Sequence, residues 1–148
     1  MNAPRIYLLL LTLIPIVSLA ADSYLCASDL TTGFSPSGDG KTWVTSKFKA
    51  EDKFIIARAE DVQKTAGFVW VVKPIGSKTI HFACKADFSE HGYLQCEGMG
   101  QFQFNRKTNR FLRTYTFGYV NDGAVNDNPL MALGANTPYI EIGRCSQL

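Results

Sequence analysis

Residues 79–99 read TIHFACKADFSEHGYLQCEGM. Apolar and polar side chains alternate on both sides of the polar segment 89–92, a pattern typical of two strands joined by a turn. A hairpin centred on Glu90 places Cys84 opposite Cys96, where paired strand residues have Cβ atoms about 4.5–5.5 Å apart. The sequence therefore predicts a cross-strand disulfide between these two residues.

The other two cysteines, Cys26 and Cys145, lie near the ends of the chain. An even number of cysteines in an exported chain is typical of disulfides, and four cysteines allow three pairings. We predict Cys26–Cys145 together with Cys84–Cys96, and the other two pairings are the alternatives. The first bridge would close nearly the whole mature chain and remove about 4–5 kcal/mol of freedom from its unfolded state.

Residues 1–20 have the pattern of a secretory signal peptide. A short basic segment with Arg5 precedes an apolar run over 6–17, and small residues at Ser18 and Ala20 suit a cleavage site. A membrane anchor is the alternative, but it needs about 20 apolar residues. We expect cleavage after Ala20, which leaves 21–148 as a single domain that is periplasmic or secreted.

The mature segment consists of short strand-like runs separated by turn residues, without a convincing amphipathic helix. This pattern predicts an all-β fold, an antiparallel meander barrel or half-barrel of about eight strands with two disulfides. A β-sandwich is the alternative. Residues 60–67 are expected to form a polar connection with one helical turn, and 31–42 a loop. The expected strands cover 24–28, 43–49, 54–59, 68–72, the two arms of the hairpin, 101–105, 110–119 and 139–144.

The charge of the chain is small overall but is concentrated in one hairpin. The 148 residues carry a formal net charge of +2, which falls to +1 when Arg5 leaves with the signal peptide. This balance gives no reason to expect nucleic-acid binding or stable membrane insertion of the mature chain. No acidic residue lies between Glu97 and Asp122, whereas four cations lie within eight residues: Arg106, Lys107, Arg110 and Arg113. They predict a contact with an anionic partner, either an envelope protein or an anionic polymer.

A long connection over 121–138 is the second candidate for partner binding, because loops of this length are often functional. Leu130 and Met131, apolar residues in its middle, either insert into a partner or fold over the mouth of the barrel. The Asn and Asp oxygens of this loop suit Ca²⁺, but their spacing is not that of an EF-hand and Asx turns explain them equally well. We predict no metal and no cofactor.

The aromatic residues give an alternative function, a carrier of a small apolar ligand in a barrel cavity. The predicted lining is Trp43, Trp70, Phe102, Phe104 and Tyr115. The same rings could instead fill the interior of a small barrel.

An enzyme, a small envelope hydrolase, is the second alternative. Acids and imidazoles gather near the first hairpin: His81, Asp87, Glu90, His91 and Glu97. No catalytic motif accompanies them, and the spacing of the hairpin's histidines and cysteines matches no common zinc pattern. The sequence therefore predicts no catalytic residue.

Three segments, FQFNRKTNRF at 102–111, GYV at 118–120 and TPYIEIGRC at 137–145, resemble a group of small exported proteobacterial proteins to which no activity is assigned. The resemblance implies a Gram-negative envelope location and supplies no catalytic residue. The expected architecture is also similar to exported lysozyme-inhibitor and lipocalin-type barrels, an analogy of fold alone. The leading hypothesis is an exported, non-enzymatic binding protein, with inhibition of a hydrolase as one concrete form.

Overall fold

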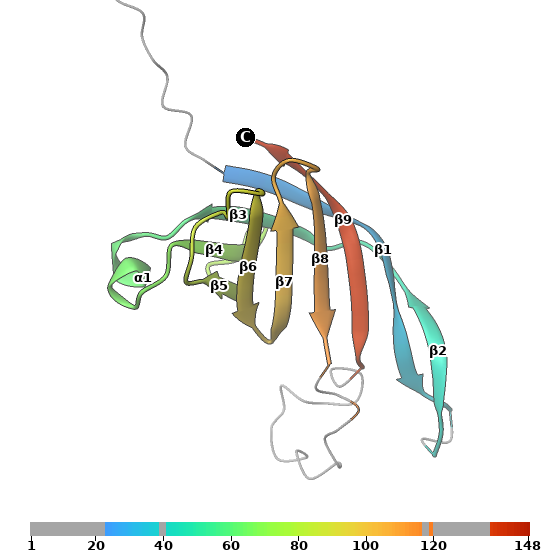
Figure 1. The fold of residues 1–148 in the computed structure, drawn as a ribbon. Coiled ribbons are helices and arrows are strands. Elements are labelled where there is room, and N and C mark those ends of the chain that lie inside the picture. The colour runs from blue at the N-terminus through green and yellow to red at the C-terminus, as the bar shows by residue number, and fades with distance from the viewer. Residues whose placement is uncertain (1–22, 39–40, 117–118, 120–136) are drawn as a thin grey trace, which may run out of the picture.

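The computed structural model describes residues 23–38, 41–116, 119 and 137–148, so the predicted signal peptide at 1–20 lies outside the described residues. The described residues form nine strands and one short helix (Figure 1). The elements are β1 (Ser23–Pro36), β2 (Trp43–Phe48), β3 (Lys53–Arg58), α1 (Asp61–Thr65), β4 (Trp70–Pro74), β5 (Phe82–Cys84), β6 (Tyr93–Gly98), β7 (Gly100–Asn105), β8 (Arg110–Tyr115) and β9 (Tyr139–Gln147). The helical turn expected within 60–67 is α1.

Eight of these strands close into an antiparallel barrel. From β3 to β9 each strand pairs with the next one along the chain, and β1 pairs with both β3 and β9. The predicted meander barrel is therefore confirmed, and closure excludes the sandwich. β2 pairs only with the second half of β1, beyond the point where β3 ends, and so extends the sheet outside the barrel (Figure 1).

Both predicted disulfides are confirmed. Cys26 and Cys145 lie opposite each other on β1 and β9, so their bond ties the seam at which the barrel closes. Cys84 and Cys96 join β5 to β6, and the pairing of Ala83 with Glu97 is the register expected for a hairpin centred on Glu90. Two disulfides indicate an oxidising compartment outside the cytoplasm. Within the described ranges, no helix has the length and apolar character needed to cross a bilayer.

The prediction of a loop over 31–42 is wrong, because β1 continues to Pro36. The pairing of β1 with β9 shifts register between Ser28 and Leu30, so Asp29 is an extra residue that interrupts the alternation of the strand. Gly33, which suggested a loop, is required for close strand contact, since a Cβ atom there would overlap the carbonyl oxygen of Pro138.

The interior of the barrel is filled over most of its length by aromatic rings. Phe102 packs between Phe54 and Phe82, with ring centroids 5.9 and 5.6 Å away, and stacks on Phe111 at 5.2 Å. Farther along β8 the inward positions change from apolar to charged, because Arg113 follows Phe111 on the same face. The barrel thus has an aromatic core and a polar end.

Candidate binding surface and the polar end of the barrel

The turn between β7 and β8 is fixed by a single side chain. The Asn105 Oδ1 atom accepts hydrogen bonds from the backbone N–H groups of Lys107 (2.8 Å) and Thr108 (3.3 Å). Asn109 then adopts a left-handed conformation with φ of 55°, which asparagine tolerates better than most residues. This local chemistry holds Arg106 and Lys107 at the exposed tip of the hairpin.

Three of the four predicted cations lie on the surface. The guanidinium of Arg106 lies over the Phe88 ring, 4.7 Å from its centroid. Arg110 points outward from β8 and is paired in register with Arg144, whose own charge is balanced by Asp29 at 2.9 Å. Among the described residues, no carboxylate forms an ion pair with Arg106, Lys107 or Arg110. These three charges are available to an anionic partner.

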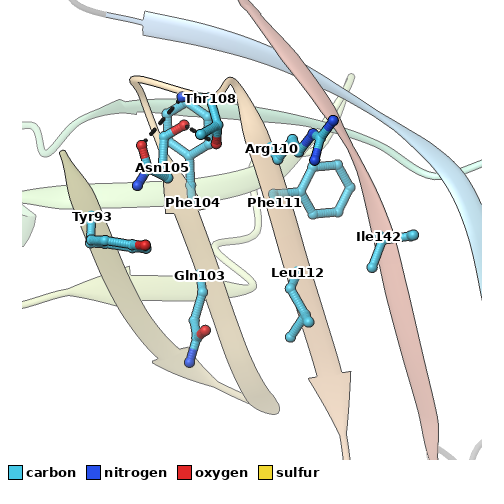
Figure 2. A pocket seen from close by; sticks show the side chains of 9 residues that line it. All are labelled: Tyr93, Gln103, Phe104, Asn105, Thr108, Arg110, Phe111, Leu112 and Ile142. Atoms are coloured by element: carbon cyan, nitrogen blue, oxygen red, sulfur yellow. Dashed lines mark hydrogen bonds between the residues drawn. The ribbon is translucent and has the colours of Figure 1, made fainter. Parts of the chain in front are cut away.

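Beside these cations, the outer face of the sheet carries exposed apolar side chains that the sequence analysis missed. A pocket of about 380 Å³ opens there, with Tyr93, Gln103, Arg110, Leu112 and Ile142 among its lining residues (Figure 2). The register places Leu112 beside Ile142, and Ile142 beside Leu30 of β1. Ile142 is 43% exposed and Leu30 is 66% exposed. We name this surface the outer face and define it by Tyr93, Gln103, Arg110, Leu112, Ile142 and Leu30.

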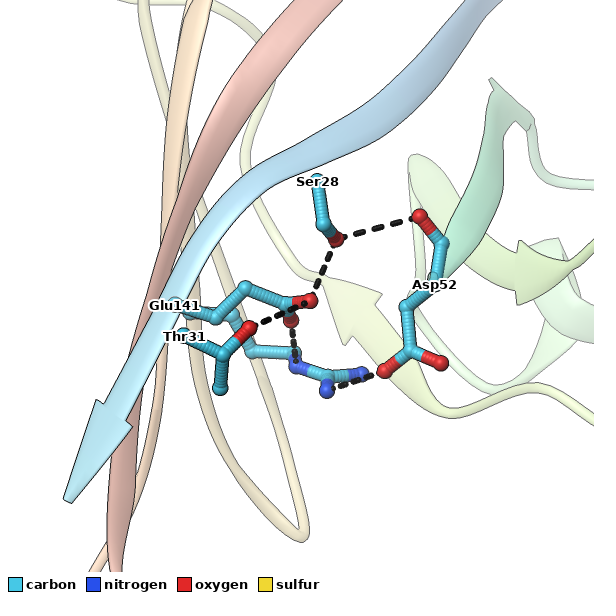
Figure 3. A network of polar contacts seen from close by, with 5 residues as sticks. Ser28, Thr31, Asp52 and Glu141 are labelled. Carbon is cyan, nitrogen blue, oxygen red and sulfur yellow. Dashed lines mark hydrogen bonds and ion pairs between the residues drawn. The ribbon is translucent and has the colours of Figure 1, made fainter. Parts of the chain in front are cut away.

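Arg113 corrects the predicted basic hairpin, because it points into the barrel and is 7% exposed. Its Nη2 atom lies 2.6 Å from Oδ2 of Asp52, and its Nε atom lies 2.5 Å from Oε2 of Glu141 (Figure 3). The guanidinium also lies over the rings of Phe54 and Tyr139, at 4.7 and 4.9 Å from their centroids. Its charge is therefore engaged inside the molecule.

Glu141, the internal partner of Arg113, is 1% exposed. Ser28 donates a hydrogen bond to its Oε1 atom, and Thr31 approaches the same oxygen at 3.5 Å. Both hydroxyls face inward because the extra residue Asp29 lies between them. Burial raises the pKa of Glu141, while the hydrogen bond from Ser28 and the charge of Arg113 act in the opposite direction. The cluster joins β1, β8, β9 and the segment before β3.

The five rings predicted to line a ligand cavity do not come together. Trp70, Phe102, Phe104 and Tyr115 are 0–5% exposed and belong to the packed interior. Trp43 lies apart from them on β2, where it contacts Tyr119 at 5.3 Å between centroids. A separate pocket of about 490 Å³ lies beside Trp43 and is lined by Phe34, Trp43, Thr116, Tyr119 and Pro138.

The acids and imidazoles near the first hairpin make separate contacts. Asp87 accepts hydrogen bonds from Trp70 Nε1 and Arg58 Nη1, both at 2.8 Å. Partial burial opposes ionisation of Asp87, but these bonds outweigh it and lower its pKa. His91 lies 3.2 Å from Glu90 at the exposed turn. In the part of the chain that the structure describes, no three His, Cys, Asp or Glu side chains form a possible metal site.

Leu130, Met131 and most of the predicted loop at 121–138 lie outside the described residues. Their part in binding stays a prediction, as does the resemblance to exported proteobacterial proteins. Comparison of the chain with protein-family models, with curated proteins and with solved structures found no match.

Proposed function

We propose that this protein is an exported, non-enzymatic binding protein of the bacterial envelope that engages an acidic protein surface through its outer face. The observation that carries the proposal is the position of three unpaired cations, Arg106, Lys107 and Arg110, beside exposed apolar side chains on one side of the barrel. A periplasmic or secreted location accords with the two disulfides.

The chemistry of the outer face suits a protein partner. Protein interfaces have an apolar centre and a polar rim, and their energetically important residues are enriched in tyrosine and arginine. Here Leu112 and Ile142 supply the centre, and Tyr93 and Arg110 lie at its border. Arg144 beside Arg110 is already paired with Asp29, so a carboxylate of the partner would find Arg110 as the unpaired cation of this pair.

The alternatives gain less support from the same geometry. A carrier needs an internal cavity, but four of the five rings predicted to line it are buried, and Phe102 among them packs against Phe54 and Phe82 in the filled interior. A hydrolase needs convergent catalytic groups, but Asp87 and His91 are held in separate contacts. Inhibition of an envelope-directed hydrolase is one form that binding through the outer face could take.

Site-specific photocrosslinking tests this proposal. A benzophenone amino acid replaces Leu112 on the outer face or, as the matched control, exposed Lys78 in the connection between β4 and β5. In cells that export the protein, we expect a discrete adduct to an acidic protein from position 112 only, and we expect Arg110→Glu to abolish it. Equal adducts from both positions, or an adduct that Arg110→Glu leaves unchanged, would contradict the proposal.

A further inference from the structure

The closed barrel leaves one described strand with an open edge. In the sheet order, β2 has β1 on one side and no described strand on the other, and Figure 1 draws it at the outside of the sheet. Proteins commonly protect such edges with proline, bulges or inward charges. Within Trp43–Phe48 there is no proline, and the register with β1 is continuous. The edge is therefore able to accept another strand.

The hydrogen bonds of β1 show which groups of β2 face this edge. The N–H of Phe34 donates to the carbonyl of Pro138 at 3.0 Å, on the β9 side of β1. Backbone groups alternate along a strand, so Gly33 and Ser35 direct theirs to β2, where they pair with Ser46 and Val44. The intervening residues of β2, which are Trp43, Thr45 and Lys47, direct their N–H and C=O groups to the open edge.

We propose that β2 pairs antiparallel with β2 of a second copy of this chain. Trp43, Thr45 and Lys47 can all form backbone hydrogen bonds with the second copy only when Thr45 lies on the two-fold axis. This register gives about six backbone hydrogen bonds. Thr45 then faces Thr45 of the partner subunit, and threonine pairs are favourable across strands. This single register follows from the backbone directions alone.

The side chains agree with the same register. Trp43 lies opposite Lys47 of the partner subunit, and each ammonium meets the face of an indole ring. Trp43 is 36% exposed, and its ring contacts Tyr119 at 5.3 Å between centroids, which leaves part of the indole accessible. The two Lys47 side chains are about 13 Å apart along the strands, so their repulsion is weak. A lysine on an edge strand commonly discourages pairing with another strand, but Lys47 is complementary to Trp43 of the partner subunit in this register.

Cysteine crosslinking tests directly whether Thr45 lies next to Thr45 of the partner subunit. The four native cysteines form two disulfides, so an introduced thiol is the only free one. Under mild oxidation we expect the Thr45→Cys variant to form a covalent dimer at least about tenfold faster than Thr32→Cys, an exposed control on β1. Equal rates would overturn the proposal.

Sedimentation of the uncrosslinked protein provides the second test. The wild type and Thr45→Val are expected to dimerise reversibly as concentration rises. Thr45→Lys places like charges on the axis and is expected to weaken the dimer by about tenfold or more, with an unchanged thermal unfolding curve at dilutions where both proteins are monomers. A wild type that sediments as a monomer at every concentration would overturn the proposal, as would a Thr45→Lys variant that dimerises equally.

Discussion

Replacing Arg113 by methionine removes the internal cation of the polar end while preserving most of the side-chain volume. Glu141 is then left without a cation at 1% exposure, and breaking a buried ion pair in this way costs about 3–5 kcal/mol. The bond to Asp52 adds little, because that carboxylate is 54% exposed and screened by solvent. We therefore expect Arg113→Met to lower the free energy of unfolding by about 3–5 kcal/mol.

The double variant Arg113→Met with Glu141→Leu separates the ion pair from simple packing. Removing both charges leaves no uncompensated ion, so we expect most of the stability to return. Urea unfolding at pH 8 with the disulfides intact measures each free energy by linear extrapolation. Exposed Arg110→Met is the matched control and should change stability by less than about 0.5 kcal/mol. A loss below about 1 kcal/mol in Arg113→Met, or a double variant as unstable as the sum of its singles, would refute the reasoning.

The remaining predictions concern titration and backbone contact. Hydrogen bonding lowers the pKa of Asp87 below its usual 3.8, so its stabilising contribution is present above that value and is lost as pH falls through the lowered pKa. Urea titrations should therefore show that Asp87→Asn lowers the free energy of unfolding more at pH 7 than in strong acid. The stabilising contribution of Glu141 depends on pH in the opposite direction, because its raised pKa makes that contribution greatest below the unfolded-state pKa and smaller as pH rises. The free energy of unfolding of the wild type relative to Glu141→Gln should therefore fall from pH 4 to pH 8, and a difference that does not change with pH would contradict this. A Cβ atom at Gly143 would overlap both the carbonyl oxygen of Ala27 and the Phe111 ring. Thermal unfolding should therefore show a loss of about 1–3 kcal/mol for Gly143→Ala and almost none for Gly38→Ala, which has open space.

Regular alternation made most of the barrel predictable from sequence. Both arms of the hairpin at 79–99 and the pairing of its cysteines follow from a period of two residues around a polar turn. The first strand extends farther than its sequence predicts, because the Gly, Pro and Ser residues of 31–42 are typical of a loop and the bulge at Asp29 interrupts the alternation of the strand. Gly33 then suggested flexibility at a place where two backbones in fact approach closely.

The candidate site was predictable only in part, because a strand sequence does not say which parity faces inward. Arg113 lies three residues after Arg110, and their closeness in sequence predicts one basic surface, although the two side chains point to opposite faces of β8. The apolar outer face escaped notice for the same reason. In β9 the inward position belongs to Glu141 at 1% exposure, which places the apolar Ile142 outside at 43%.

The affinity for the partner crosslinked from the outer face tests the central claim most directly. With that partner purified, we would compare the wild type with Arg110→Glu and with the control Lys78→Glu. Loss of one charge-assisted contact and its replacement by a like charge should raise Kd by at least about tenfold for Arg110→Glu and leave Lys78→Glu unchanged. The wild-type affinity should also fall with added salt, as expected for exposed charges. Equal dissociation constants for the three proteins would contradict a binding role for the outer face.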